Sequence, residues 1–444
     1  MKVRQLVSKQ KNLPTFNTKM SQNILLTKKD KIAKGEVHLT GSKSECNRAL
    51  VIEALSGGKV RVENISDAAD TVTLQKVLGL NLQPASHAQP VVQLVEDKIV
   101  NIGPAGTAMR FLTAYYTLQN EEVVLTGSER MKQRPIGILV DALRKLGAEI
   151  SYEENEGFPP IRIKGNIQQA TDKISIKGNI SSQYITALLL IAPKLPMGLE
   201  VHIEGDLTSR PYVEMTLGML EQAGIKHEWK DNVISIPHQE FKETSLPVEP
   251  DWSAASYWYS IAALADEADL FLHGLTSYSL QGDSVITEIM ANFGITSQFR
   301  NGGVHIKKEP KQIGRKEFDL KKCPDLAQTV VVVCAALNHE ATFTGLETLK
   351  IKETDRIKAL QNELAKMGVK LIEDNESYTL DCSGKFIPER MFINTYDDHR
   401  MAMAFAPLAL ITPELEVEDA QVVEKSYPAF WTDLEKVGFE VKDI

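Results

Sequence analysis

The chain has 444 residues, more than one ordinary hydrophobic core accommodates, so two domains or one internally repeated architecture are expected. Lysine and arginine number 50 against 59 aspartate and glutamate residues, and the formal net charge is -9. That balance argues against a nucleic-acid partner, because proteins that bind nucleic acids usually carry a basic excess. With 43% hydrophobic and 25% charged residues, the composition is that of a folded globular protein and excludes disorder over most of the chain.

The four cysteines lie far apart without a C-x-x-C pair, and the nine histidines show no spacing typical of metal ligands. We therefore expect no metal site and no disulfide framework, and reduced thiols favour a cytoplasmic location. The longest apolar runs, 185–193 and 401–413, are shorter than the roughly 20 residues that cross a bilayer, so no membrane partner is expected. Residues 1–20 are polar and basic, and we expect them to form a poorly ordered leader.

A recurring pattern is the most informative feature of the sequence: an amphipathic helix, then a glycine, then a short alternating strand. Glycine adopts positive φ without a Cβ clash and therefore commonly follows the last turn of a helix. The pattern occurs six times at intervals of roughly 70 residues, so repeats of one unit account for nearly the whole chain. The glycines are Gly79, Gly147, Gly224, Gly294, Gly368 and Gly438.

Each unit also contains a second, alanine-rich helical stretch. These stretches are 47–56, 107–117, 183–192, 254–263, 327–336 and 400–410. Because they are apolar nearly all round, they are expected to be buried helices. Most lead into an alternating strand, such as 60–63 or 123–125. The sequence therefore predicts a mixed α/β fold built from repeated units of two helices and several strands.

Three units precede residue 250 and three follow it, which predicts two similar domains with a cleft between them. The proline-containing stretch 246–251 is the expected crossover. A short strand at 34–39 is expected to pair with the second domain, which places the other crossover at 40–42. The predicted domains are therefore 41–250, and 21–40 together with 251–444.

The predicted helices begin with small, hydroxyl and charged residues, and helix N-termini bind anions through free N–H groups. If equivalent helix ends face one way, many of them line the cleft and form a site for a polyanion. Any one of these residues is equally an ordinary helix cap. Neither a Walker G-x-x-x-x-G-K-[ST] motif nor a G-x-G-x-x-G fingerprint is present, which disfavours nucleoside triphosphates and NAD.

The charged segment 352–356 has two interpretations. It is either a solvated face or part of a site. Lys352 and Arg356 open a helix, where cations oppose the helix dipole and so require another reason to be there. His399, between Asp398 and Arg400, is as compatible with a structural role as with a catalytic one.

Eight motifs, in this order, closely resemble the 3-phosphoshikimate 1-carboxyvinyltransferase (EPSP synthase) family. The similarity runs from about residue 30 to the C-terminus. The motifs are G-S-K-S-x-x-N-R-A-L (41–50), A-G-T-A-M-R (105–110), R-M-K-Q-R-P-I-G (130–137), S-S-Q (181–183), S-R-P-Y (209–212), P-D (324–325), K-E-T-D-R (352–356) and D-H-R-M-A-M (398–403).

The resemblance implies the enolpyruvyl transferase fold, an inside-out α/β barrel in which each of two domains holds three α/β units around pseudo-threefold symmetry. It also implies transfer of the enolpyruvyl group of phosphoenolpyruvate to the 5-hydroxyl of shikimate 3-phosphate, with release of phosphate. This reaction belongs to chorismate and aromatic amino-acid biosynthesis. The small-molecule partners would be these two substrates, no metal or organic cofactor would be needed, and we expect a monomer.

The resemblance further implies the site residues. Residues implied to hold shikimate 3-phosphate are Lys43, Ser44, Arg48, Ser181, Ser182, Gln183, Ser209 and Tyr212. Residues implied to hold the phosphate and carboxylate of phosphoenolpyruvate are Lys43, Gly106, Arg134, Arg356, Arg400 and Lys425. Lys352, Asp325 and Thr348 complete the substrate-binding set. Guanidinium groups suit these ligands because they bind carboxylates and phosphates with two parallel hydrogen bonds.

Two carboxylates among these cations are candidates for proton transfer. Addition needs one proton removed from the 5-hydroxyl and one delivered to the phosphoenolpyruvate methylene, which suits two carboxyl groups of opposite protonation. Asp325 resembles the base and Glu353 the proton donor, and Lys43 is a competing candidate for either transfer.

Three departures from the family pattern concern the substrates. Pro104 replaces the asparagine of a Gly-Asn-Ala-Gly motif, Thr348 stands where an asparagine is common, and the segment 80–102 is shortened. Two alternatives therefore stay open. One is the sister enolpyruvyl transferase acting on UDP-N-acetylglucosamine, which typically carries a cysteine where 127–135 has none. The other is a non-catalytic anion-binding relative.

Overall fold

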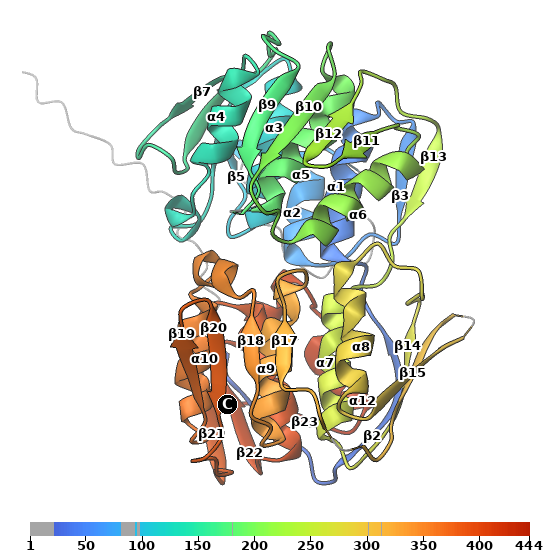
Figure 1. The fold of residues 1–444 in the computed structure, drawn as a ribbon, viewed down its shortest axis with the longest axis vertical. Coiled ribbons are helices and arrows are strands. Elements are labelled where there is room, and N and C mark those ends of the chain that lie inside the picture. The colour runs from blue at the N-terminus through green and yellow to red at the C-terminus, as the bar shows by residue number, and fades with distance from the viewer. Residues whose placement is uncertain (1–21, 81–93, 96–97, 180, 301, 312) are drawn as a thin grey trace, which may run out of the picture.

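The computed structural model describes residues 22–80, 94–95, 98–179, 181–300, 302–311 and 313–444. The leader expected at 1–20 and most of the shortened segment within 80–102 lie outside the described residues. Two hydrophobic cores are present: one contains buried residues between Cys46 and Val248, and the other joins Ile24–Leu39 to Trp252–Phe439. Figure 1 shows the chain folded into two halves stacked along the long axis. No helix in the described part of the chain is long and apolar enough to cross a membrane.

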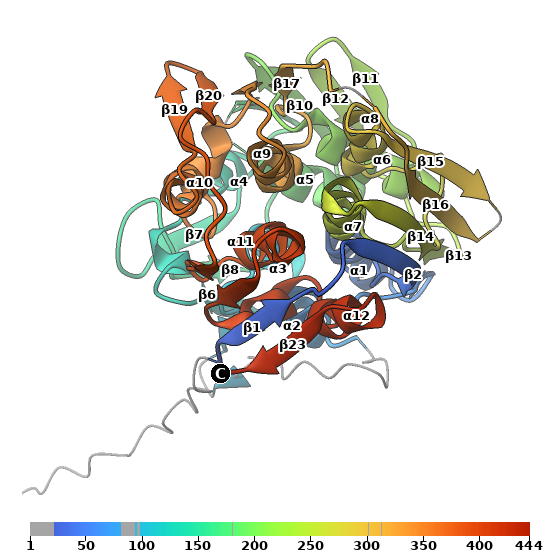
Figure 2. The same cartoon turned by 90° about the horizontal axis from the view of Figure 1, so that it is seen from below.

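The centre of each half is formed by three of the predicted alanine-rich helices. In the half containing 41–250 they are α1 (Lys43–Leu55), α3 (Gly106–Leu118) and α5 (Ser182–Ile191). In the other half they are α7 (Trp252–Leu264), α9 (Ala327–Ala336) and α11 (His399–Phe405), which Figure 2 shows end-on in the middle of the ring. The expected helix at 400–410 divides into α11 and a 3-10 helix, Ala406–Leu410. Pro407 explains the division, because proline cannot donate the next α-helical hydrogen bond.

The glycine-terminated helices surround these central helices. They are α2 (Ala69–Val77), α4 (Gly137–Lys145), α6 (Arg210–Gln222), α8 (Ile286–Ala291), α10 (Arg356–Ala365) and α12 (Phe430–Lys436). Each is followed by its predicted glycine, and all six glycines have positive φ. The repeat read from the sequence is therefore confirmed, because each glycine takes the left-handed conformation that ends a helix.

Among the described residues, three sheets flank the helices of the half containing 41–250. Their strand orders are β4-β5-β6-β8-β7, β11-β12-β10-β9 and β13-β3. The strands are β3 (Val60–Glu63), β4 (Leu94–Val95), β5 (Ile99–Asn101), β6 (Glu122–Thr126), β7 (Glu149–Tyr152), β8 (Ile161–Lys164), β9 (Lys173–Lys177), β10 (Leu199–Glu204), β11 (Glu228–Lys230), β12 (Val233–Ile236) and β13 (Thr244–Pro247).

The other half also has three sheets, each of four strands: β21-β22-β1-β23, β15-β16-β14-β2 and β17-β18-β20-β19. The strands are β1 (Ile24–Thr27), β2 (Ile32–His38), β14 (Glu267–His273), β15 (Ile295–Arg300), β16 (Gly303–Lys308), β17 (Glu317–Asp319), β18 (Thr342–Thr344), β19 (Lys370–Asp374), β20 (Ser377–Asp381), β21 (Arg390–Ile393), β22 (Glu414–Val417) and β23 (Glu440–Asp443). The predicted pairing of the early strand is confirmed, since β2 runs parallel to β14.

The chain passes between the halves twice, and the two passages lie side by side. Ser42 N donates to Glu249 O at 2.8 Å, and Asp251 N donates to Thr40 O at 3.0 Å. Gly41 and Pro250 form an isolated antiparallel bridge between these hydrogen bonds. Because α1 and α7 begin directly after the two passages, their N-termini are held close together at the boundary between the halves.

Candidate active site

A polar cavity lies at this boundary, where the central helices of both halves begin. Its walls contain every residue predicted for the site except Gly106 and Lys425. The lining residues are Lys43, Ser44, Arg48, Thr107, Arg110, Arg134, Pro135, Ser181, Ser182, Gln183, Tyr184, Thr208, Ser209, Tyr212, Asp325, Thr348, Ile351, Lys352, Glu353, Arg356, His399 and Arg400.

One wall is built from the N-termini of helices α1, α5 and α6. Ser42 caps α1, and Ser181 caps α5 by accepting a hydrogen bond from Gln183 N at 3.3 Å. Ser44, Ser182 and Ser209 lie beside these helix starts and line the cavity. The free N–H groups and positive dipole ends therefore meet hydroxyl groups in one place, which suits a phosphorylated ligand.

Arg48 is a predicted ligand that the fold also uses for positioning. Its guanidinium is buried and donates to Thr216 Oγ1 at 2.9 Å, Ser44 O at 2.6 Å and Tyr212 O at 3.2 Å. Arg48 therefore fixes α1 against α6 while contributing positive charge to the cavity wall. Lys43, at the opening of α1, is held by an ion pair of 3.3 Å with the buried Asp70.

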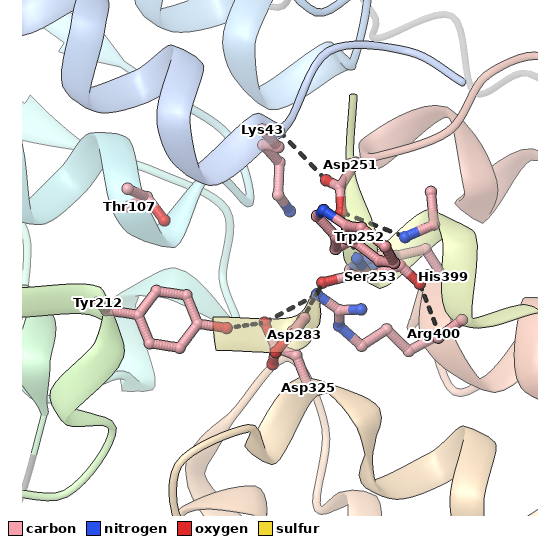
Figure 3. Close-up of polar contacts among 12 residues, drawn as sticks. Lys43, Thr107, Tyr212, Asp251, Trp252, Ser253, Asp283, Asp325, His399 and Arg400 are labelled. Carbon is pink, nitrogen blue, oxygen red and sulfur yellow. Dashed lines mark hydrogen bonds and ion pairs between the residues drawn. The ribbon is translucent and has the colours of Figure 1, made fainter. Parts of the chain in front are cut away.

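Asp325 lines the cavity and joins the two halves through its contact with Tyr212 (Figure 3). Its carboxylate accepts hydrogen bonds from Arg400 Nη2 at 2.8 Å and from the Tyr212 hydroxyl at 3.1 Å. Arg356 Nη1 lies 3.4 Å from its other oxygen. Burial alone would raise the pKa of Asp325, but the positive charges of Arg400, Lys352 and Arg356 outweigh burial and hold it below its ordinary value.

Glu353 is surrounded by three cations. Its oxygens lie 2.9 Å from Arg356 Nη2, 3.1 Å from Lys425 Nζ and 3.7 Å from Arg134 Nη1. Burial opposes ionisation of the carboxyl, yet Lys425, Arg356 and Arg134 hold the pKa of Glu353 well below its ordinary value. The Glu353 carboxyl group is therefore ionised.

Gly106 and Lys425, the two predicted residues that do not line the cavity, each lie against a residue that does. A Cβ atom placed on Gly106 would lie 2.5 Å from Arg134 Nη1, so glycine is needed for the arginine to pass. Lys425 lies on an adjoining cavity and reaches Glu353, and its Nζ also donates to Pro104 O at 3.3 Å. Pro104 thus contributes its carbonyl oxygen to the site. This contact does not need the side-chain amide of the asparagine that Pro104 replaces.

Several lining residues were not predicted for the site. Arg110 is buried and donates to Gly106 O at 3.2 Å and to Pro135 O at 2.8 Å, so it fixes the loop that carries Arg134. His399, which the sequence left undecided, lines the cavity, and its ring nitrogens have no hydrogen-bond partner among the described residues. Burial, followed by the charge of Lys43, lowers its pKa well below the ordinary value. The motif letters around 105–110 and 398–403 were the available signals for both.

Comparison with known proteins identifies the family of the chain. The sequence model of EPSP synthase (3-phosphoshikimate 1-carboxyvinyltransferase) matches residues 27–434. A 3-phosphoshikimate 1-carboxyvinyltransferase of Bacteroides fragilis is 46% identical over 412 residues, which cover 92% of this chain and 96% of the relative. The chain belongs to the EPSP synthase family. A second relative of the same name, from Xenorhabdus nematophila, is 35% identical over 421 residues, covering 91% of this chain and 96% of the relative.

Solved structures show the same fold. The EPSP synthase from Acinetobacter baumannii superposes with a TM-score of 0.72 at 21% identity, covering 95% of this chain and all of that one. The enolpyruvyl transferase NikO from Streptomyces tendae gives a TM-score of 0.72 at 15% identity, covering 96% and 99% of the two chains. The predicted enolpyruvyl transferase fold is therefore confirmed for this member of the EPSP synthase family.

Proposed function

We infer that the chain is an enzyme that transfers the enolpyruvyl group of phosphoenolpyruvate to the 5-hydroxyl of shikimate 3-phosphate and releases phosphate. The observation that carries this conclusion is the family match over residues 27–434, together with relatives of that name. The reaction belongs to aromatic amino-acid biosynthesis. The cavity fits it chemically, because both substrates are phosphorylated carboxylates and the walls combine cations, hydroxyl groups and helix N-termini.

We propose that the wall formed by α1, α5 and α6 holds shikimate 3-phosphate. The phosphate would be bound by hydroxyl groups and helix-start N–H groups, and Lys43 would reach toward both substrates. The residues assigned to this ligand are Lys43, Ser44, Arg48, Ser181, Ser182, Gln183, Ser209, Tyr212 and Thr348. Threonine at 348 keeps a hydroxyl donor where related sequences often have an amide.

We propose that phosphoenolpyruvate occupies the side of the cavity where Glu353 meets its cations. Arg134, Arg356, Arg400, Lys425 and Lys352 would bind its phosphate and carboxylate, and Gly106 would leave room for the Arg134 guanidinium. Arg400 and Arg356 contact Asp325, and Glu353 is contacted by Arg356, Lys425 and Arg134. An arriving anion therefore takes over contacts that the two carboxylates now hold.

The same contacts support the proposed proton transfers. Asp325 is ionised, lies at the boundary of the halves and accepts a hydrogen bond from Tyr212, so it is placed to take a proton from a hydroxyl group. Glu353 would receive a proton once phosphoenolpyruvate neutralises its neighbours and would then donate it to the methylene carbon. Addition followed by loss of phosphate completes the transfer.

Release of phosphate in the presence of each acceptor tests the function. Purified protein is expected to release phosphate from phosphoenolpyruvate only when shikimate 3-phosphate is added. Release with UDP-N-acetylglucosamine instead would favour the sister transferase, and binding of both substrates without any release would favour a non-catalytic relative. The loop 127–135 lacks a cysteine, which argues against the sister transferase.

We also propose that residues 21–40 with 251–444 and residues 41–250 act as two domains of a cytoplasmic monomer. Separate hydrophobic cores support the division, and four buried, unpaired cysteines suit a reducing compartment. Light scattering that gives about twice the chain mass of 49.4 kDa would contradict the monomer.

A further inference from the structure

A buried carboxyl group lies close to Asp325 (Figure 3) and is not among the residues that line the cavity. Asp283 belongs to the 3-10 helix Gly282–Val285, and its side chain is almost fully buried. One of its oxygens accepts a short hydrogen bond from the Ser253 hydroxyl. The other oxygen has no hydrogen-bond partner among the described residues. A buried carboxyl with one partner is costly for the fold, which calls for another reason for its presence.

Two neighbouring aspartates have a clear structural role, because each caps a helix by accepting backbone hydrogen bonds. Asp251 caps α7 by accepting from Ser253 N at 2.7 Å and Ala254 N at 3.2 Å. Asp398 caps α11 by accepting from Arg400 N at 2.9 Å. Asp283 accepts no backbone hydrogen bond in the described part of the chain. Helix capping therefore does not explain it.

Asp283 is connected to Asp325 through two side chains. The Ser253 hydroxyl that donates to Asp283 also accepts from Arg400 Nη2 at 3.4 Å. The same Arg400 nitrogen donates to Asp325 at 2.8 Å. Arg400 Nη2 thus contacts both Asp325 and the Ser253 hydroxyl that is bonded to Asp283, so a change at Asp283 reaches, through Ser253, the guanidinium that pairs with Asp325.

We propose that Asp283 is a positioning residue that acts through Ser253 and Arg400 to set the proton affinity of Asp325. The inference rests on the proposed function, in which Asp325 is the base for the 5-hydroxyl. Three cations face Asp325 and weaken it as a base. A negative charge on Asp283, near both Arg400 and Asp325, offsets part of their effect and makes Asp325 a better proton acceptor.

The charge of Asp283 depends on pH because of the groups around it. Burial, followed by the negative charge of Asp325, raises the pKa of Asp283 to about 7. The other groups that face it are Arg400 from α11, Asp251 before α7, Tyr212 from α6 and the Cys323 thiol. Asp283 is therefore protonated below about pH 7 and ionised above it, and its support for Asp325 grows over that range.

The test is the pH dependence of kcat and KM for the unaltered protein, Asp283→Asn, Ser253→Ala and a matched control, Asp433→Asn. Asp433 is also buried but contacts Tyr427 and Lys436.

We expect kcat of the unaltered protein to rise between about pH 6 and pH 8. Asp283→Asn should lower kcat on the order of 10-fold above pH 7 and abolish the rise, with both KM values changed less than about 2-fold. Ser253→Ala should act in the same direction, and Asp433→Asn should keep the rise.

A kcat profile for Asp283→Asn that matches the unaltered protein would overturn the inference. So would a uniform loss at all pH values accompanied by an equal fall in thermal stability, because that result marks a purely structural residue. Absence of turnover in the unaltered protein rejects the proposed function instead. In that case ¹³C NMR of labelled aspartate carboxyls still tests the coupling between Asp283 and Asp325. The Asp325 resonance should shift near pH 7, and Asp283→Asn should remove that shift. An unshifted Asp325 resonance in the unaltered protein contradicts the coupling.

Discussion

Glu353 Oε1 lies 3.1 Å from Lys425 Nζ, in an ion pair that occupies the place proposed for phosphoenolpyruvate. Arg356 holds the other oxygen at 2.9 Å. The cations proposed to bind phosphoenolpyruvate thus contact a carboxylate of the protein itself. Under the proposed function, the substrate and Glu353 compete for the same positive charges, so binding of the substrate changes the protonation of Glu353.

The first prediction is that binding of phosphoenolpyruvate makes Glu353 take up a proton. The cations hold the pKa of Glu353 well below its ordinary value. Bound substrate occupies those cations and adds negative charge, which raises the pKa. Calorimetry in two buffers of different ionisation enthalpy measures the protons exchanged, with 5-deoxyshikimate 3-phosphate present to prevent turnover. The unaltered protein should take up more protons than Glu353→Gln, by up to about one per site. Equal uptake by both proteins would contradict the competition.

Glu353→Gln should also lose turnover. Glutamine keeps the shape and the hydrogen-bonding oxygen of the side chain but cannot deliver a proton to carbon. We expect kcat to fall on the order of 100-fold or more, while both substrates still bind. Steady-state kinetics together with equilibrium binding measure the two effects separately. Near-normal kcat would remove Glu353 from proton transfer.

Gly106→Ala should weaken phosphoenolpyruvate binding selectively. The added Cβ would lie 2.5 Å from Arg134 Nη1, so the guanidinium must shift away from the substrate. The KM for phosphoenolpyruvate is expected to rise on the order of 10-fold, with the KM for shikimate 3-phosphate nearly unchanged. Gly314→Ala is the matched control, because no atom lies within 4 Å of a Cβ at that position. An equal rise in both KM values would indicate general distortion of the cavity.

Glu45 should make stability fall as pH rises. It is buried beside the passages between the halves, where it accepts from Glu249 N at 2.8 Å, and burial raises its pKa to about 8. In the unfolded chain a glutamate titrates near about pH 4.3. Between these values the folded state binds more protons than the unfolded state, so stability declines through this window.

The Glu45 prediction is checked by thermal unfolding of Glu45→Gln between about pH 5 and pH 8. The variant should match the unaltered protein near pH 5 and unfold a few degrees higher near pH 8. Glu376→Gln, at an exposed position, should follow the unaltered protein throughout. Parallel curves for the unaltered protein and Glu45→Gln would show that Glu45 carries no buried proton.

The repeated helices could be predicted from the sequence because their signals are local. The glycine after α4 or α10 and the serine before α5 mark helix ends within a few residues of the chain. The repeat also predicted that the helix starts line one cavity, because equivalent helix starts in repeated units face the same boundary. The motif resemblance then supplied the individual residues, including Lys425, whose own surroundings carry no distinctive pattern.

Contacts between distant residues could not be predicted in this way. Arg356 meets Asp398, 42 residues later, and Arg400 meets Ser253, 147 residues earlier. Neither pairing leaves a periodic or compositional trace, because each depends on how whole units pack together. The position of Asp283 beside Ser253 and Arg400 has the same origin: its sequence neighbours suggest an ordinary helix start, and only the packed structure shows that one of its oxygens lacks a hydrogen-bond partner among the described residues.

Transfer of a labelled enolpyruvyl group tests the central claim most directly. Phosphoenolpyruvate carrying ¹³C at carbon 2 is incubated with shikimate 3-phosphate and the protein, and the products are followed by NMR. The label should appear in an enol ether at the 5-oxygen of shikimate 3-phosphate, with one phosphate released for each label transferred. Label that stays in phosphoenolpyruvate, or appears in pyruvate alone, would contradict the assigned reaction.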